Sequence, residues 1–392
     1  MIGFPMNKQL TTASILAVSL TLASCEDPSN MEASQQGYRG TAMETVQNEE
    51  LEALKVALNQ MPEPLYPPES STDGDMATDI YENIQVLTNL RAAEFDRLMA
   101  HITEWIAPEE GCAYCHNLDE GFQDDSVYTK HVARKMLEMT INFNANWESH
   151  VGNVGVTCYT CHRGKAVPDN LWFKAVPDRA NKTVGYRAAQ NRPTEDINFS
   201  SLPEDPFSPY LLGDRNIRVN SPTALPTGTA PEGGIKNTEY TYALMTHMSQ
   251  SLGVNCTFCH NSRAFAEWDQ SPPARATAWF GIRMVREANN DYMVPLTDQF
   301  PDNRLGPTGD VGKVYCATCH AGANKPLLGA PMLVDFPELW GGRQFDMANL
   351  SEEERKELVA KAMAEAELAH ATARGKAPEN HEEDTAAGLN EE

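Results

Sequence analysis

The pentapeptide Cys112-Ala-Tyr-Cys115-His116 is the first of four copies of one pattern in this 392-residue chain. C-x-x-C-H is the attachment signature of c-type haem, in which two thiols bind the porphyrin covalently and the adjacent histidine ligates the iron. Because a porphyrin is a large, flat and apolar body, four of them would also supply much of the core. The copies, called motifs 1 to 4, are Cys112–His116, Cys158-Tyr-Thr-Cys161-His162, Cys256-Thr-Phe-Cys259-His260 and Cys316-Ala-Thr-Cys319-His320.

The motifs predict four haem c groups, numbered in the same order, with His116, His162, His260 and His320 as proximal ligands. C-x-x-C alone also occurs in redox dithiols and in zinc sites. A zinc site would combine Cys and His in fours, without a His directly after the second Cys each time. Eight of the nine cysteines lie in the motifs and the ninth is Cys25, so none remains for a disulfide or a nucleophile.

The N-terminus has the features of an export signal. Lys8 precedes the apolar run Ile15–Leu22, which is too short to span a bilayer comfortably and ends in small residues before Cys25. Residues 1–24 resemble a bacterial lipoprotein signal, in which Cys25 would become the acylated N-terminus. A plain signal peptide and an uncleaved anchor are the alternatives. All three place the folded part outside the cytoplasm, where c-type haem is attached.

The composition is that of a soluble, acidic protein. The formal net charge is −24 and the mean hydropathy is −0.46. The acidic balance argues against nucleic acid as a partner. It suits a basic protein partner, because complementary charge speeds encounter, although an acidic surface also simply favours solubility.

Apolar spacing predicts a mainly α-helical chain with long irregular segments. Helices are expected at residues 81–106, 126–141, 238–252 and 273–290, and the chain divides into two pseudo-repeated two-haem units. The expected segments are a tether and wrap at 25–80, a haem 1/haem 2 unit at 81–165, a Pro-rich connection at 166–235, a haem 3/haem 4 unit at 236–345 and an acidic, partly helical tail at 346–392.

The sixth iron ligands are expected on the helices before the motifs. A methionine opposite the histidine raises the reduction potential of a haem, and a second histidine lowers it. A helical methionine is also an ordinary core residue, so one member of each pair would only pack. The candidates are Met99, Met136 or Met139, and Met245 or Met248, with His101, His131 and His247 as rivals.

Two stretches resemble the tetrahaem cytochrome subunit of purple-bacterial photosynthetic reaction centres. They are Tyr242–Asn261, around motif 3, and Asn144-Ala-Asn-Trp-Glu-Ser-His150 followed by Gly155–Gly164, around motif 2. The resemblance covers residues 60–340, with the order and spacing of all four motifs, and the lipoprotein-type start fits it. The tail, 350–392, has no counterpart in that family pattern.

This resemblance implies the ligands residue by residue. It makes Met99, Met136 and Met245 the sixth ligands of haems 1, 2 and 3, and His150 the sixth ligand of haem 4, opposite His320. The internal repeat instead puts Met284 in the place of Met136 and would make it the ligand of haem 4. The close match around motif 2 favours His150.

The resemblance also implies an electron carrier on the periplasmic face of the photosynthetic membrane, not an enzyme. Electrons would pass from a soluble cytochrome c or a high-potential iron–sulfur protein, through haem 1, to haem 3 beside the bacteriochlorophyll pair of L- and M-type core subunits. Arg263, Arg275 and Arg283 are candidates for raising a haem potential. A multihaem reductase or peroxidase would need an iron with an open position, whereas each motif here has a candidate sixth ligand. Only the resemblance separates the photosynthetic function from a periplasmic or respiratory electron shuttle.

Overall fold

The computed structural model describes residues 30–35, 44–67, 74–174, 194–197, 201–219 and 234–341. The expected signal peptide with Cys25 and the acidic tail lie outside these residues. Within the described ranges, none of the helices combines the length and apolar character that crossing a bilayer requires.

Four long helices form the framework: α4 (Ala92–Ile106), α5 (Tyr128–Asn146), α8 (Ile235–Leu252) and α9 (Ala274–Glu287). Motifs 2 and 4 form the short helices α7 (Cys158–His162) and α10 (Cys316–His320). The expectation of a mainly α-helical chain with long irregular segments is confirmed. The other elements are β1 (Met31–Gln35), β2 (Glu44–Asn48), α2 (Glu49–Leu58), α3 (Ala77–Ile80), η2 (Gly111–Tyr114), α6 (Glu148–Val151), η3 (Ser208–Leu212), η4 (Cys256–Phe258), η5 (Ala288–Met293), η6 (Val294–Gln299), η7 (Asp302–Arg304), η8 (Pro326–Gly329), η9 (Met332–Val334) and η10 (Pro337–Leu339).

The first long helix starts later than its apolar spacing predicted. Asn83 and Leu87 have φ values of 65° and 64°, in the left-handed region that a helix cannot contain. The helix begins at Ala92, where the Glu94 carboxylate accepts the Arg91 backbone N–H at 2.9 Å, as an N-terminal cap does. Residues 81–91 are therefore an irregular lead-in, and the prediction of helix there was wrong.

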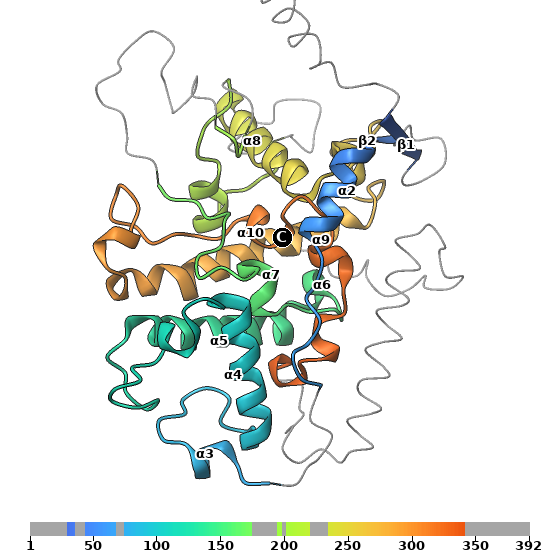
Figure 1. Ribbon diagram of the computed structural model, residues 1–392. Helices are drawn as coiled ribbons and strands as arrows, with labels where there is room; N and C mark the ends of the chain where they lie inside the picture. The colour runs from blue at the N-terminus through green and yellow to red at the C-terminus, as the bar shows by residue number, and fades with distance from the viewer. Residues whose placement is uncertain are drawn as a thin grey trace, which may run out of the picture.

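Of the long helices, α4 and α5 lie on one side of the short motif helices and α8 lies on the other. Figure 1 shows α4 and α5 in the lower part of the view and α8 in the upper part, with α7 and α10 between them. α7 packs against α4, and α10 packs against both α8 and α7. The packing therefore runs continuously from α4 through the two short helices to α8.

The lower core contains an ion pair as well as apolar side chains. Leu98 and Trp105 of α4 pack against Phe336 and Leu339 of the C-terminal turns. Beside them, Arg97 Nη1 lies 2.9 Å from the Glu338 carboxylate, and both side chains are buried. These contacts hold the end of the described chain against the first long helix.

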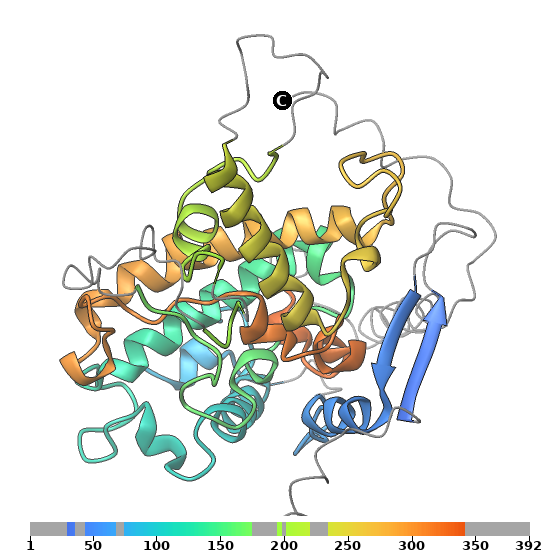
Figure 2. The same ribbon diagram turned by 90° about the horizontal axis from the view of Figure 1, so that it is seen from above.

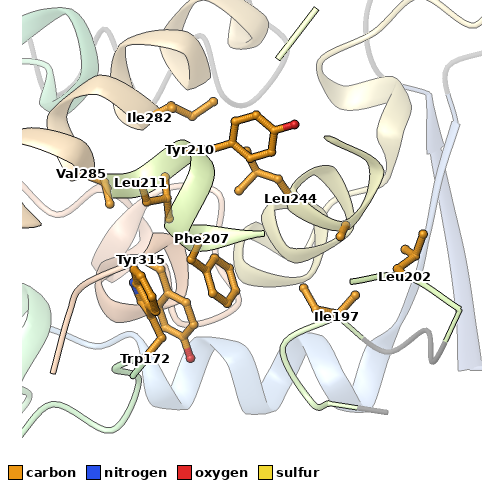
Figure 3. Close-up of a cluster of buried hydrophobic side chains, with 11 residues drawn as sticks. Trp172, Ile197, Leu202, Phe207, Tyr210, Leu211, Leu244, Ile282, Val285 and Tyr315 are labelled. Carbon is orange, nitrogen blue, oxygen red and sulfur yellow. The ribbon is translucent and has the colours of Figure 1, made fainter. Parts of the chain in front are cut away.

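The upper core draws on the Pro-rich connection (Figure 3). Phe207, Tyr210 and Leu211 insert between Leu244 of α8 and Ile282 of α9. The described parts of this connection contain one π-helical turn, η3, and an isolated bridge between Trp172 and Lys313. The segment therefore builds the core of the α8/α9 half.

The two halves meet in a third cluster, and the N-terminal segment lies outside both. Met139 and Phe143 of α5 and Val151 of α6 pack against Met284 of α9. The antiparallel β1–β2 hairpin and α2 lie at one side of the molecule (Figure 2). β2 also contacts η4, so the N-terminal segment reaches the region of motif 3.

Candidate haem sites

Motifs 2 and 4, called the inner motifs, share one helical conformation. In each, the threonine hydroxyl before the second cysteine accepts the backbone N–H of the residue before the first cysteine: Thr160 from Thr157 at 2.9 Å, and Thr318 from Tyr315 at 3.0 Å. The residue after the histidine is left-handed in both, with φ of 51° at Arg163 and 45° at Ala321. Both helices therefore begin with the same threonine cap and end at a residue in the left-handed conformation.

Motifs 1 and 3, called the outer motifs, form single 3₁₀ turns instead. No residue of η2 or η4 is buried, whereas Cys158, Thr160, Thr318 and His320 of the inner motifs are. An asparagine follows each outer histidine, and its side-chain oxygen accepts the N–H two residues on: Asn117 from Asp119 at 3.2 Å and Asn261 from Arg263 at 3.0 Å. Short asparagine turns therefore close the outer motifs.

The inner motifs touch each other. The sulfur atoms of Cys161 and Cys319 lie 2.8 Å apart, at the contact between α7 and α10. All eight motif cysteines are free thiols. Two haems attached here would therefore have their attachment edges side by side.

A backbone carbonyl orients the histidine of each motif. Nδ1 lies 3.1 Å from the Phe122 oxygen in His116, 2.8 Å from that of Lys165 in His162, 2.9 Å from that of Phe265 in His260 and 2.9 Å from that of Ala323 in His320. Because a carbonyl only accepts, Nδ1 carries the proton, which leaves Nε2 of each ring to bind iron. Burial lowers the pKa of all four rings, to about 4 at His320, so they are held in the neutral form that ligates a metal.

One cavity of about 1100 Å³ connects the first two motifs. It exceeds the range of roughly 300–1,000 Å³ that single small-molecule sites occupy. Apolar side chains of α4, α5 and the segments around motifs 1 and 2 form much of its lining, which suits porphyrins. The expected haem 1 and haem 2 residues all line it: Met99, Cys112, Cys115, His116, Met136, Cys158, Cys161 and His162.

His150 approaches the haem 4 motif from the other half of the chain. Its Nδ1 donates to the Thr277 carbonyl of α9 at 2.9 Å, and its ring centroid lies 6.0 Å from that of His320. A metal–imidazole bond of about 2 Å, with the centroid about 1 Å behind the nitrogen, would put two rings about 6 Å apart across one iron. The two histidines therefore have the spacing of an axial pair.

Gly281 makes room for His150. A Cβ built on Gly281 would lie 2.4 Å from Cε1 of the His150 ring. Any side chain there would displace the ring. Met284, the alternative from the internal repeat, is buried on the same helix among Met139, Phe143 and Val151.

The rival histidines are hydrogen-bonded within the protein. His101 Nδ1 lies 2.8 Å from the Arg97 oxygen, and its Nε2 accepts the Leu65 N–H at 3.0 Å. His247 contacts the Asp196 carbonyl through Nδ1 and the Ser251 hydroxyl through Nε2, and His131 Nε2 donates to the Asp125 carbonyl. Both ring nitrogens of His101 and His247 are thus engaged. Met245 and Met248 both pack against the upper core.

Of the three arginines singled out in the sequence, Arg275 interacts with a motif cysteine. Its Nη1 donates to Ser271 Oγ at 2.7 Å, its guanidinium lies 4.1 Å from the Trp268 ring centroid, and it interacts electrostatically with the Cys259 thiol. Arg283 instead stacks on Trp279, at 3.0 Å. Arg263 contributes its backbone N–H to the asparagine turn of motif 3.

The sequence interpretation missed the residues that shape the inner sites. Thr160 and Thr318 occupy the same position in motifs 2 and 4 and are absent from motifs 1 and 3, so the signal was present in the pentapeptides themselves. Gly281 carried no local signal, because its role depends on a contact with His150, which lies far away in the chain.

Paired thiols next to histidines with Nε2 free to bind iron, beside an apolar cavity, define a c-type cytochrome. No group of three or more His, Cys, Asp or Glu side chains that could hold a metal ion exists within the described ranges, whereas a structural zinc site would need four protein ligands. The profile of the family described as photosynthetic reaction centre cytochrome C subunit matches residues 26–340. The chain belongs to this family, and the resemblance seen in the sequence is confirmed.

Individual relatives agree with the family profile. The chain is 49% identical over 329 residues to the photosynthetic reaction center cytochrome c subunit of Rubrivivax gelatinosus, covering 84% of this chain and 88% of the relative. It is 44% identical to that of Thermochromatium tepidum (85% and 81% covered) and 42% identical to that of Roseobacter denitrificans (81% and 88% covered). The protein is thus a haem protein of photosynthetic electron transport and a subunit of a membrane-associated complex.

Proposed function

We propose that this chain carries four covalently bound haem c groups and relays electrons from a soluble periplasmic donor to the photo-oxidised bacteriochlorophyll pair of the reaction-centre core. The observation that carries the proposal is a continuous series of contacts that runs from motif 1 to the helix before motif 3. Motifs 1 and 2 line one cavity, motifs 2 and 4 meet at Cys161 and Cys319, and α10 packs on α8, which precedes motif 3. The haems would follow one another in the order 1, 2, 4, 3.

The ligand assignment is part of this proposal. Each proximal histidine pairs with one sixth ligand: Met99 for haem 1, Met136 for haem 2, Met245 for haem 3 and His150 for haem 4. His150 is preferred over Met284 because its ring is already oriented by Thr277 and lies 6.0 Å from that of His320. Haem 4 would then have the lowest potential of the four.

The protein holds the haems in place and shields them from water. When bound, the haems supply one-electron chemistry. The carbonyl contacts fix the tautomer and the plane of each histidine ring. Buried side chains of α4, α5, α8 and α9 exclude water, which keeps the reorganisation around each site small. The chain needs no acid, base or nucleophile, in accord with an electron carrier and not an enzyme.

The two-unit repeat is a second part of the proposal. The supporting observations are the paired conformations: threonine-capped helices at motifs 2 and 4, and asparagine turns after motifs 1 and 3. In addition, Gly164 donates its N–H to the Trp105 carbonyl near the end of α4, and Gly322 donates to Ser251 near the end of α8, both at 2.8 Å. A gene duplication of one two-haem unit would produce these pairs.

The donor would dock at haem 1. Leu118 and Phe122, beside motif 1, are 54% and 59% exposed, and Asp119 and Glu120 lie between them. Apolar contact ringed by acidic groups suits a small electron carrier with the opposite charge, whether a cytochrome c or a high-potential iron–sulfur protein. Anchoring through an acylated Cys25 would hold the chain on the periplasmic membrane face beside the L- and M-type subunits.

A flash experiment on membranes tests the proposal. The haem α-band is followed after a short actinic flash at several poised redox potentials, together with the haem content per chain. Oxidation within microseconds, with four haems and one distinctly low-potential component, is the expected result. An intact, reduced four-haem protein that no flash oxidises would instead indicate a respiratory or free periplasmic shuttle.

A further inference from the structure

The residue after motif 2 reaches across to motif 4. Arg163 is left-handed, with φ of 51° and ψ of 43°, and its counterpart after motif 4 is Ala321, with nearly the same backbone. The backbone of the two positions is thus matched, but only one of them has a long cationic side chain. The two inner motifs therefore differ in charge at the point where they meet.

The Arg163 guanidinium makes three hydrogen bonds to two other segments of the chain. Nη2 donates to the Cys319 carbonyl of α10 at 3.0 Å and to Asn59 Oδ1 at 3.1 Å, and Nη1 donates to the Leu58 carbonyl at 2.7 Å. Asn59 is fully buried, and its Nδ2 donates to the Ala321 carbonyl at 3.3 Å. The end of α2 is therefore tied to both inner motifs through one arginine and one asparagine.

The charge at this junction has only neutral partners. Within the described part of the chain, no carboxylate forms an ion pair with Arg163, and its contacts are two backbone carbonyls and an amide oxygen. The buried Nε atom has no hydrogen-bond partner. An arginine stays protonated in proteins, so a full positive charge persists beside Cys161 and Cys319.

We propose that Arg163 sets the reduction potentials of haems 2 and 4 together, raising both through its fixed positive charge at the junction of the inner motifs. A ferric haem carries one more positive charge than a ferrous one, and a cation nearby disfavours the ferric state. Because the guanidinium contacts motif 4 while it belongs to motif 2, it acts on both haems. This role rests on the proposed four-haem function.

Three variants of the holoprotein separate charge from structure. Arg163→Gln removes the charge. Asn59→Asp keeps Arg163 but puts a carboxylate against its guanidinium, and Asn59→Ala is the matched control that loses the same amide without adding charge. Each is titrated by its α-band at stepped potentials, with the haem count and the melting temperature measured on the same sample.

We expect two of the four midpoint potentials to fall in Arg163→Gln and the same two to fall in Asn59→Asp. Asn59→Ala should lower the melting temperature but leave all four midpoints in place. Equal shifts in Asn59→Ala and Asn59→Asp, or unchanged midpoints in both charge variants, would show that Arg163 only holds the fold. If Arg163→Gln does not accumulate, the two Asn59 variants decide the matter alone. A wild-type haem count other than four contradicts the proposed function instead.

Discussion

The outer and inner motifs share a pentapeptide but not a conformation. Cys112 and Cys256 of the outer motifs are exposed and sit on 3₁₀ turns, whereas Cys158 of the inner motifs is buried and starts an α-helix. The difference comes from the second variable position, which is Thr160 or Thr318 in the inner motifs and Tyr114 or Phe258 in the outer ones. The short threonine side chain places its hydroxyl within reach of the backbone N–H three residues earlier and caps a helix, whereas the aromatic residues form no such cap.

The comparison teaches that attachment chemistry and structural role are separable. The pentapeptide supplies two thiols and a histidine wherever it occurs. The inner copies also form the contact between the two halves, through Cys161 and Cys319 and through the bonds of Arg163. The outer copies lie at the two ends of the proposed haem order, where a partner must reach the haem.

The largest expected difference between the two kinds of motif follows from removing a haem. Cys158→Ala with Cys161→Ala, and Cys112→Ala with Cys115→Ala, should each reduce the haem count from four to three. The inner pair should destabilise the protein by at least about 2 kcal/mol more than the outer pair, because it also opens a cavity between the halves. Pyridine haemochrome counts and thermal melts measure both effects. Equal melting temperatures would refute the structural role of the inner motifs.

A second large effect is expected at His150, the proposed sixth ligand of haem 4. His150→Leu should convert haem 4 from low spin to high spin and remove the lowest-potential component, because the second imidazole is lost. Met284→Leu, a volume-conserving change, should leave the spin state intact and cost less than about 1.5 kcal/mol of stability. Electron paramagnetic resonance and a redox titration distinguish the two. High-spin haem in the Met284 variant alone would reverse the assignment.

A smaller effect is expected at the threonines. Thr318 Oγ1 accepts the Tyr315 N–H at 3.0 Å and donates to the Asn170 carbonyl at 2.6 Å, in a buried setting. Thr318→Val leaves both groups unpaired and should cost about 2–3 kcal/mol. Thr257→Val in motif 3 should cost about 0.5–1 kcal/mol, because the Asn255 oxygen still accepts the backbone N–H there. Chemical denaturation compares the two, and a larger loss at Thr257 would contradict the comparison.

The smallest effect is a pH dependence confined to motif 1. Asp125 Oδ1 lies 2.9 Å from both Arg134 and Lys130, and Lys130 also donates to the Phe122 carbonyl that orients His116. The hydrogen bond from Arg134, then that from Lys130, lowers the pKa of Asp125 below its ordinary 3.8. The stabilisation is therefore complete above about pH 4 and lost as pH falls through the lower, folded-state pKa.

Hydrogen exchange of the loop after motif 1 measures this dependence. The protection of these amides, measured against their intrinsic exchange rates at each pH, should fall below pH 3.8 before any change at the inner motifs, whose caps contain no carboxylate. Asp125→Asn should abolish the acid step and cost about 0.5 kcal/mol or less at neutral pH, since the Asp125 side chain is 33% exposed and its ion pairs are partly screened by solvent. Simultaneous opening of motifs 1 and 2 in acid would contradict the prediction that motif 1 opens independently of the inner motifs.

The long helices were predicted from the sequence, but not all of their boundaries were. The helices around Met99, Met136, Met245 and Met284 were expected, since apolar spacing repeats along them. The start of α4 was placed too early, because residues 81–91 have helical spacing but positive φ at Asn83 and Leu87. Tertiary contacts decide such positions: Asn83 Nδ2, for instance, donates to the Gln123 carbonyl across the motif 1 loop.

The Pro-rich connection was expected to be irregular, but the sequence did not predict which of its apolar residues are buried. Phe207, Tyr210 and Leu211 fill the core between α8 and α9. A loop with nine prolines has no periodicity from which a buried face can be deduced. Only the packed neighbours show which of its side chains turn inward.

By itself, the sequence determined that this protein belongs to the reaction-centre cytochrome family and binds c-type haem, and it predicts the attachment cysteines and the proximal histidines. Covalent attachment needs only residues adjacent in the chain, so a pentapeptide specifies it completely. The tertiary structure decided the contact of motifs 2 and 4, the meeting of His150 with His320 over Gly281, and the reach of Arg163 to Cys319. Each of these joins residues more than a hundred positions apart, and chain folding alone brings such residues within bonding distance.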